Sequence, residues 1–293
     1  MNKPPTPESE YLVGVASRVA AILTANPLAR AAMVSGSAAE GRADRSSDVD
    51  LMVYYDALPE DDELVAARAR LGGPPRRWSI DERPHGFVEA FLLDGIEVQI
   101  AHLTVDQWER DIDAVLGAKE VASPLQKAMS GTLIARPLYG EALVSEWKSR
   151  IANFPDGLAR AMVRHYLRFF ALWGVAEVVA RRDAVVWRYE MCVEAAQNLL
   201  GVLAGLNRTY YTPFQFKRMH AMIDGLAFAP HDCAERIERL FDADPVKAAL
   251  EMEELVREVV ALVQQHMPEV DTSIAEQRLG WRHQPWAPAV GRC

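Results

Sequence analysis

Two acidic residues follow a glycine-serine turn at a spacing that suits metal chemistry. Asp48 and Asp50 are separated by one apolar residue, and they come after the segment Gly36-Ser37-Ala38-Ala39-Glu40-Gly41. In a strand, alternate side chains project from the same face, so both carboxylates would share one open face. Two carboxylates this close repel each other unless a cation lies between them, and Mg²⁺ prefers such oxygen ligands. The pair therefore predicts a site for one or two Mg²⁺ ions.

The turn before this pair suits a phosphate group. Gly36 and Ser37 offer backbone N–H groups and a hydroxyl, which are donors for phosphate oxygens. An isolated Asp-x-Asp also occurs at solvated strand ends, and Gly-Ser is a common turn dipeptide. The functional interpretation is favoured because both features occur together, after one apolar strand and before another.

The stretch from Gly36 to Val53 resembles the nucleotidyltransferase superfamily of DNA polymerase beta type, whose pattern is Gly-Ser, a spacer, and Asp-x-Asp entering a strand. The resemblance covers only about the first hundred residues, and it names a superfamily but no substrate. It implies an NTP co-substrate, with ATP as the first expectation, and Mg²⁺-dependent transfer of a nucleoside monophosphate to a hydroxyl group. Arg42 and Arg45, in the loop between the two motifs, are expected phosphate contacts.

The third carboxylate of this superfamily is missing from its usual place. The chain resembles a branch whose next strand reads Gly-x-x-Val-Asp followed by His, but here the stretch is Gly95-Ile96-Glu97-Val98-Gln99-Ile100-Ala101-His102. Gln99 aligns with that Asp, and its neutral amide ligates a metal weakly and cannot act as a general base. Glu97, one pleat away, is the expected catalytic and metal-ligating substitute. The alternative is a weakened or lost activity. His102 is expected to be a structural hydrogen bonder rather than a ligand.

The second half of the chain carries helical stripes and resembles the bundle of small-molecule nucleotidyltransferases, including those that adenylylate aminoglycosides or lincosamides. The resemblance implies an acceptor held between the two halves and a bundle carboxylate that orients or deprotonates it. Glu194 is the candidate, because it lies within a largely apolar helical segment; a surface salt bridge is the alternative.

A loop rich in cations and aromatics follows that helical segment. Arg208 and Lys217 are candidate contacts for triphosphate oxygens, and Tyr210 is a candidate for stacking on a base. An equally supported interpretation is that Asn207 closes the helix and Arg208 bridges the domains.

Composition limits the class of protein and of partner. The 293 residues are half apolar and one quarter charged, as in a soluble chain of one large or two ordinary domains. The net charge of −9 argues against a nucleic-acid substrate and favours a neutral or cationic small-molecule acceptor. A homodimer remains open. The three cysteines show no metal-ligand spacing, and no apolar run suggests a signal region or a membrane span, so a cytoplasmic protein is expected.

The fold that must position these residues is expected to be α+β. Residues 1–140 are predicted to form a mixed β-sheet nucleotidyltransferase domain with helices on one face, and residues 141–293 a helical bundle with an extended C-terminal tail. The expected strands are 29–34, 48–55 and a hairpin of 87–93 with 96–102 joined by Asp94-Gly95; the expected helices are 8–25, 58–72, 103–116, 119–135, 158–179, 185–206, 234–240 and 246–266.

The alternative is a different class of function, that of a non-catalytic partner protein. Nucleotidyltransferase-like and helical domains also occur in toxin–antitoxin pairs that act on a protein or RNA partner. Arg160 and His165 match loosely the Arg-x4-His spacing of helical ribonucleases, a pattern that often arises by chance.

Overall fold

The computed structural model describes residues 4–287 and shows two compact units. The first contains the described residues up to Lys119 together with Lys127–Asn153, and the second contains Glu120–Gln126 and the described residues from Phe154 onward. In the described part of the chain no helix is long and apolar enough to cross a membrane.

The first unit is built on a mixed sheet of six strands. Their order across the sheet is β3-β4-β5-β2-β1-β6. Strands β2 and β5 run parallel, whereas the other neighbouring pairs are antiparallel. The expected α+β class is confirmed. The strands are β1 (Ala29–Val34), β2 (Val49–Tyr55), β3 (Arg76–Asp81), β4 (Gly86–Leu93), β5 (Ile96–Thr104) and β6 (Arg136–Tyr139).

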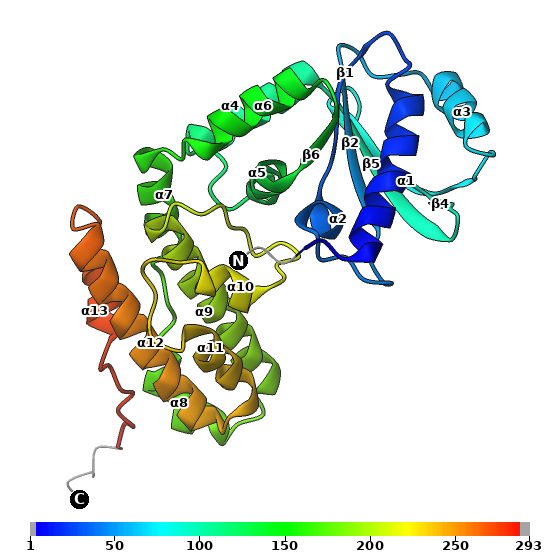
Figure 1. Cartoon of the computed structure of the whole chain (residues 1–293). Coiled ribbons are helices and arrows are strands. Elements are labelled where there is room, and N and C mark those ends of the chain that lie inside the picture. The colour runs from blue at the N-terminus through cyan, green and yellow to red at the C-terminus, as the bar shows by residue number, and fades with distance from the viewer. Residues whose placement is uncertain (1–3, 288–293) are drawn as a thin grey trace, which may run out of the picture. The chain divides into compact units, whose positions relative to one another are not determined.

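One face of this sheet packs on helix α1 (Pro7–Leu23), and Leu64 of the neighbouring helix α3 (Asp61–Arg70) lies in the same core (Figure 1). Helix α1 contributes the apolar stripe that its sequence period predicts, and the stripe is buried from Leu12 to Leu23. Val49, Leu51 and Val53 of β2 lie in the same core. Because strand side chains alternate, Asp50 and Tyr54 project from the opposite face.

Helices also cover part of that opposite face, although the sequence predicted helices on one face only. The ring of Tyr54 lies 5.8 Å from that of Trp108 on α4 (Val105–Leu116) and 4.7 Å from that of Trp147 on α6 (Glu141–Ala152). All three side chains are buried. Helix α6, which was expected to begin the second domain, therefore belongs to the sheet unit. Two further helices are α2 (Gly36–Glu40) and α5 (Leu125–Ile134).

The strands that hold the expected site have the predicted pairing. The hairpin of β4 and β5 pairs Leu93 with Ile96 and Phe91 with Val98, as the Asp94-Gly95 turn requires. Strand β5 then lies beside β2, with Gln99 directly opposite Asp50. Strands β3 and β6 were not expected from the sequence.

The second unit is helical. The helix expected over 158–179 is interrupted at residues 167–171, because two backbone carbonyls there bond to side chains from elsewhere: that of Arg168 accepts from Asn198, and that of Phe169 accepts from Arg278. The helices are α7 (Asp156–Tyr166), α8 (Leu172–Ala180), α9 (Val185–Leu206), α10 (Met219–Asp224), α11 (Cys233–Asp242), α12 (Pro245–His266) and α13 (Ser273–Arg278).

The chain after α13 is an extended strap on the helical unit, as predicted. The buried carboxylate of Glu253 on α12 accepts hydrogen bonds from the backbone of Gly280 at 2.6 Å and from the guanidinium of Arg282 at 2.7 Å. The ring of Trp281 lies directly on Gly174 of α8, where a side chain would collide with it. The rest of the predicted tail, from Pro288 to Cys293, lies outside the described residues.

Candidate functional site

Asp50 is positioned by direct contact with Gly36. Gly36 begins α2 with φ 62°, and a β-carbon placed on it would lie 2.0 Å from Oδ2 of Asp50. The backbone N–H of Ser35 also donates to the Asp50 carbonyl at 2.9 Å. Only glycine tolerates both the left-handed conformation and this contact. Gly36 of the Gly-Ser turn and Asp50 of the Asp-x-Asp pair are therefore packed directly against each other.

The loop that leads from α2 to Asp48 is held by the start of α1. The hydroxyl of Ser9, which is fully buried, accepts from the N–H of Ala43 at 2.8 Å, and the hydroxyl of Thr6 donates to the Ala43 carbonyl at 2.8 Å. Asp44 then closes a turn by accepting from the N–H of Ser46 at 2.8 Å. These contacts fix the approach of the chain to the carboxylates.

Gln99 links the first aspartate to the candidate third carboxylate. Its Nε2 donates to Oδ2 of Asp48 at 2.9 Å and to Oε1 of Glu97 at 3.1 Å. The structure therefore brings Asp48, Asp50, Glu97 and Gln99 together on the open face of β2 and β5, as the sequence predicted. The amide nitrogen, rather than its oxygen, faces the two carboxylates.

Arg77 is a site residue that the sequence did not reveal. Its Nη1 lies 2.8 Å from Oε2 of Glu97, although it belongs to β3 and Glu97 to β5, with β4 between them. Nothing in the sequence predicted β3, so nothing placed Arg77 on this face. Glu97 was expected to be available as a metal ligand, but its carboxylate accepts hydrogen bonds from Arg77 and from the Gln99 amide.

The residues present fit a Mg²⁺ ion that is shared with a nucleotide. Within residues 4–287 no group of three or more His, Cys, Asp or Glu side chains is placed to hold a metal by itself. Mg²⁺, however, is usually bound by one or two carboxylates and completed by substrate phosphates. Asp48 and Asp50 are partly exposed on one face, and the missing β-carbon of Gly36 makes the room that the second carboxylate fills.

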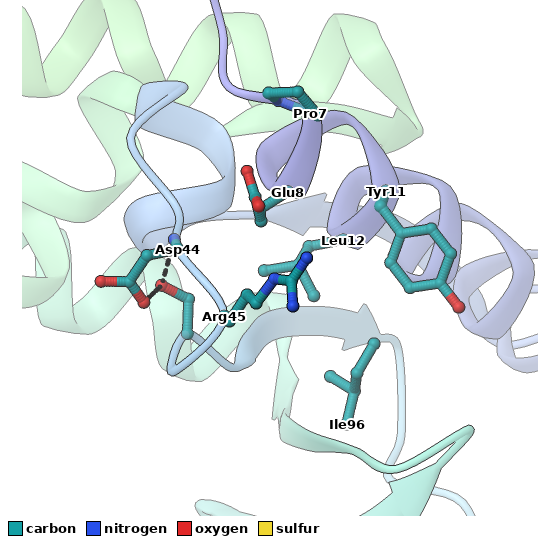
Figure 2. Close-up of a pocket in the computed structure, with 8 residues that line it drawn as sticks. Pro7, Glu8, Tyr11, Leu12, Asp44, Arg45 and Ile96 are labelled. Atoms are coloured by element: carbon teal, nitrogen blue, oxygen red, sulfur yellow. Dashed lines mark hydrogen bonds between the residues drawn. The ribbon is translucent and has the colours of Figure 1, made fainter.

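The expected phosphate contacts of this unit differ in placement. Ser37 is partly exposed in α2, next to Gly36, and Arg42 is exposed just after that helix. Arg45 extends toward Glu8 and Leu12 of α1 and lines a cavity of about 450 Å³ between α1 and the loop that joins α2 to β2 (Figure 2). This cavity is on the core side of the sheet, so its location does not support Arg45 as a phosphate contact beside Asp48.

The candidates of the helical unit are not gathered into one site by any contact within that unit. Glu194 is exposed on α9, so the reason for choosing it, a charge buried in an apolar helix, does not hold. The buried polar residue of that helix is Asn198. Lys217 is exposed in the loop before α10.

Arg208 is engaged within the helical unit. Its Nη2 lies 2.6 Å from Oδ1 of Asp156 at the start of α7, and this hydrogen bond and charge lower the pKa of that aspartate. The pair does not bridge the two units, contrary to one of the two interpretations, although Asn207 does cap α9 and bonds to Phe228 as that interpretation expected. Tyr210 is buried against Phe154, with ring centres 4.8 Å apart, so it is not placed to stack on a base.

His102 is a core residue, as expected, and belongs to a polar network that sequence reasoning missed. It is fully buried, stacked on Phe87 at 4.3 Å, with Nδ1 3.1 Å from the hydroxyl of Tyr55 and Nε2 3.5 Å from Oε1 of Glu89. Glu89 is also buried and accepts from Arg68 at 2.6 Å and Arg76 at 2.8 Å. This network lies on the core face, away from Asp50.

The ribonuclease alternative finds no supporting geometry. Arg160 pairs with Glu269 at 3.7 Å, whereas His165 faces Arg168 at 3.4 Å. The two residues of the loose Arg-x4-His match are therefore engaged with different partners.

Comparisons with known proteins give distant likenesses. No protein-family model matches the chain, and no curated protein matches it. Among solved structures it is similar to a nucleotidyltransferase-like protein from Exiguobacterium sibiricum 255-15, at 13% identity, covering 94% of this chain and 82% of that one, with a TM-score of 0.44. It is also similar to terminal uridylyl transferase 4 from Trypanosoma brucei with bound dUTP, at 14% identity, 91% and 71% coverage and TM-score 0.30. It is similar as well to a CCA-adding enzyme in complex with CTP, at 13% identity, covering 94% of this chain and 78% of that one, with a TM-score of 0.27. At these values the likenesses assign no function.

Proposed function

We propose that this chain is a Mg²⁺-dependent nucleotidyltransferase that moves a nucleoside monophosphate, AMP by first choice, from an NTP to a hydroxyl of a small molecule. The observation that carries the proposal is the contact of the Asp50 carboxylate with Gly36, with Asp48 on the same open face. A glycine turn, which suits phosphates, and a pair of acids, which suits a cation, meet at one point.

Each residue of this group has a definite task. Asp48 and Asp50 would hold the cation, and the Gly36 backbone with the Ser37 hydroxyl would hold the triphosphate tail. When bound, Mg²⁺ supplies neutralisation of the charge that develops on the phosphates. Gly36 keeps the Asp50 carboxylate against the turn, so the nucleotide and the acid share one surface. No covalent intermediate on the protein is required.

The proposal also gives roles to the other residues that the sequence predicted. Glu97 would be the third carboxylate, because the neutral Gln99 cannot accept a proton at neutral pH. Exposed Arg42 and Lys217 would contact phosphates, and exposed Glu194 the acceptor. The net charge of −9 supports a neutral or cationic acceptor over a nucleic acid.

The experiment that tests the proposal is transfer of label from α-labelled ATP, in Mg²⁺, to a panel of small amino-hydroxyl compounds. The proposal expects a labelled small molecule and release of pyrophosphate, both abolished by chelation of the metal. Label on a protein side chain or on RNA would contradict the proposed acceptor class. Absence of transfer from any of the four NTPs would contradict the proposed reaction.

A further inference from the structure

Arg77 reaches the carboxylate face from the edge of the sheet. The pairing of β3 with β4 shifts between Arg76 and Trp78, so Arg77 is the extra residue of a bulge. Its neighbour Arg76 bonds to Glu89 on the core face, whereas Arg77 bonds to Glu97 on the open face. Adjacent residues of a strand point to opposite faces, so the two neighbouring cations separate, and the bulge leaves Arg77 without a partner residue on β4.

A continuous chain of hydrogen bonds runs from this cation to the first aspartate. Arg77 donates to Oε2 of Glu97 at 2.8 Å, and Gln99 donates to Oε1 of Glu97 at 3.1 Å and to Asp48 at 2.9 Å. Both oxygens of Glu97 are therefore engaged by donors. Each oxygen keeps a second lone pair, but Arg77 neutralises the carboxylate and holds it toward the edge strand, so a divalent cation must compete with Arg77 for Glu97.

We infer that Arg77 is a positioning residue that withholds Glu97 from a divalent cation. With the Arg77–Glu97 pair closed, the site offers Asp48 and Asp50; with the pair open, it offers a third carboxylate. This inference rests on the proposed function, because it concerns the same metal site. The side chains of the pair are 49% and 28% exposed, so the pair is weak enough to exchange with a divalent ion.

The test is equilibrium binding of Mn²⁺ without nucleotide, followed by the electron paramagnetic resonance signal of the free ion. Arg77→Gln is expected to bind Mn²⁺ about fivefold more tightly than the wild type, the range that an exposed ion pair allows. The gain is expected to vanish when Arg77→Gln is combined with Glu97→Gln. Arg83→Gln is the matched control, because Arg83 pairs with Asp61 and Asp81 and contacts neither Glu97 nor Gln99. A purely structural role of Arg77 would cost affinity instead of raising it.

Two results would overturn the inference. One is an affinity of Arg77→Gln equal to or below that of the wild type. The other is a gain in Mn²⁺ affinity that persists in the Glu97→Gln background. Such a gain would come only from removing a positive charge near the site, and not from releasing Glu97. If the wild type binds Mn²⁺ and Asp50→Asn does not, while Arg77→Gln changes nothing, only this inference fails. If neither the wild type nor Arg77→Gln binds Mn²⁺, the measurement is repeated with a non-hydrolysable NTP analogue, because substrate phosphates complete the metal's ligands. Absence of Mn²⁺ binding with the analogue as well would contradict the proposed function.

Discussion

Gly36 and Asp50 depend on each other because the carboxylate occupies the space that a β-carbon at position 36 would take. The sequence predicted both residues as site members from their types and spacing. It also predicted that Glu97 and Gln99 would join them, since the register of the hairpin follows from its two-residue turn. It did not predict Arg77, because strand β3 was not predicted and the partner of Arg77 lies two strands away, on β5.

Substitution Gly36→Ala tests this contact. The new methyl group must displace the Asp50 carboxylate, so Mn²⁺ binding is expected to fall at least tenfold, with a stability loss of about 1–2 kcal/mol from the left-handed backbone. Gly72→Ala is the control, because it has φ 91° but nothing within 4 Å of its β-carbon. Equal Mn²⁺ affinity in both variants would show that the contact does not position the acid.

The sequence did not predict a role for Glu89. Strand alternation places it on the core face, where it joins Arg68 of α3, Arg76 of β3 and His102 of β5. Burial alone would raise the pKa of Glu89, but the hydrogen bond and charge of His102 and the two arginines hold it below its usual value. Burial lowers the pKa of His102 despite the nearby carboxylate.

Both shifts predict that acid destabilises the sheet unit. A group with a lowered folded pKa contributes stability above its unfolded pKa and loses it as the pH falls, so losses are expected below about 6.5 for His102 and below about 4.5 for Glu89. Glu89→Gln is expected to lower the free energy of unfolding in urea by about 3 kcal/mol at neutral pH. The difference from the wild type should shrink below the usual carboxylate pKa.

A difference that stays constant from neutral pH down into the acid range would contradict the account of Glu89. Asp94→Asn provides the control, because the Arg18–Asp94 pair is about half exposed on both sides. Its loss is expected to change the unfolding free energy by less than about 1 kcal/mol at any pH.

At the scale of elements, the sequence predicted those with a strong apolar period and missed the edge strands. Strand β1 and helix α9 have the bounds that their apolar patterns predicted. Strand β3 is exposed along its whole length and β6 contains Pro137, so neither shows the alternation of a half-buried strand, and both exist because a neighbouring strand pairs with them. The break between α7 and α8 depends on side chains far along the chain, which no local pattern contains.

The strap after α13 gives a prediction for the helical unit. In Gly174→Ala the new methyl group would lie 2.0 Å from the ring of Trp281, so the strap must lift. Tryptic cleavage after Arg282, whose side chain is held by Glu253, is expected to become severalfold faster, with a stability loss of about 1–3 kcal/mol. Gly157→Ala is the matched helical control, since its β-carbon meets nothing within 4 Å. Equal cleavage rates in the two variants would show that Trp281 does not anchor the strap.

For the whole molecule, the sequence predicted a sheet unit followed by a helical unit, but it assigned α6 to the wrong side of the boundary expected at residue 140. The break at residues 136–140 resembled a linker, yet it is the edge strand β6, and α6 returns to bury Trp147 against Tyr54. Tertiary burial, not local composition, decides where such a helix belongs. The carboxylates and the glycine turn lie together in the sheet unit.

The central claim is that Asp48 and Asp50, beside Gly36, hold the metal for nucleotidyl transfer. The most direct measurement is the Mg²⁺-dependent release of pyrophosphate with the best acceptor, compared between wild type, Asp50→Asn and Asp56→Asn. Asp56 follows the far end of the same strand and pairs with Arg30, so its substitution removes an equal charge outside the site. The account predicts a loss of at least about a hundredfold for Asp50→Asn, with unchanged folding, and none for Asp56→Asn. Equal rates for the wild type and Asp50→Asn would contradict it.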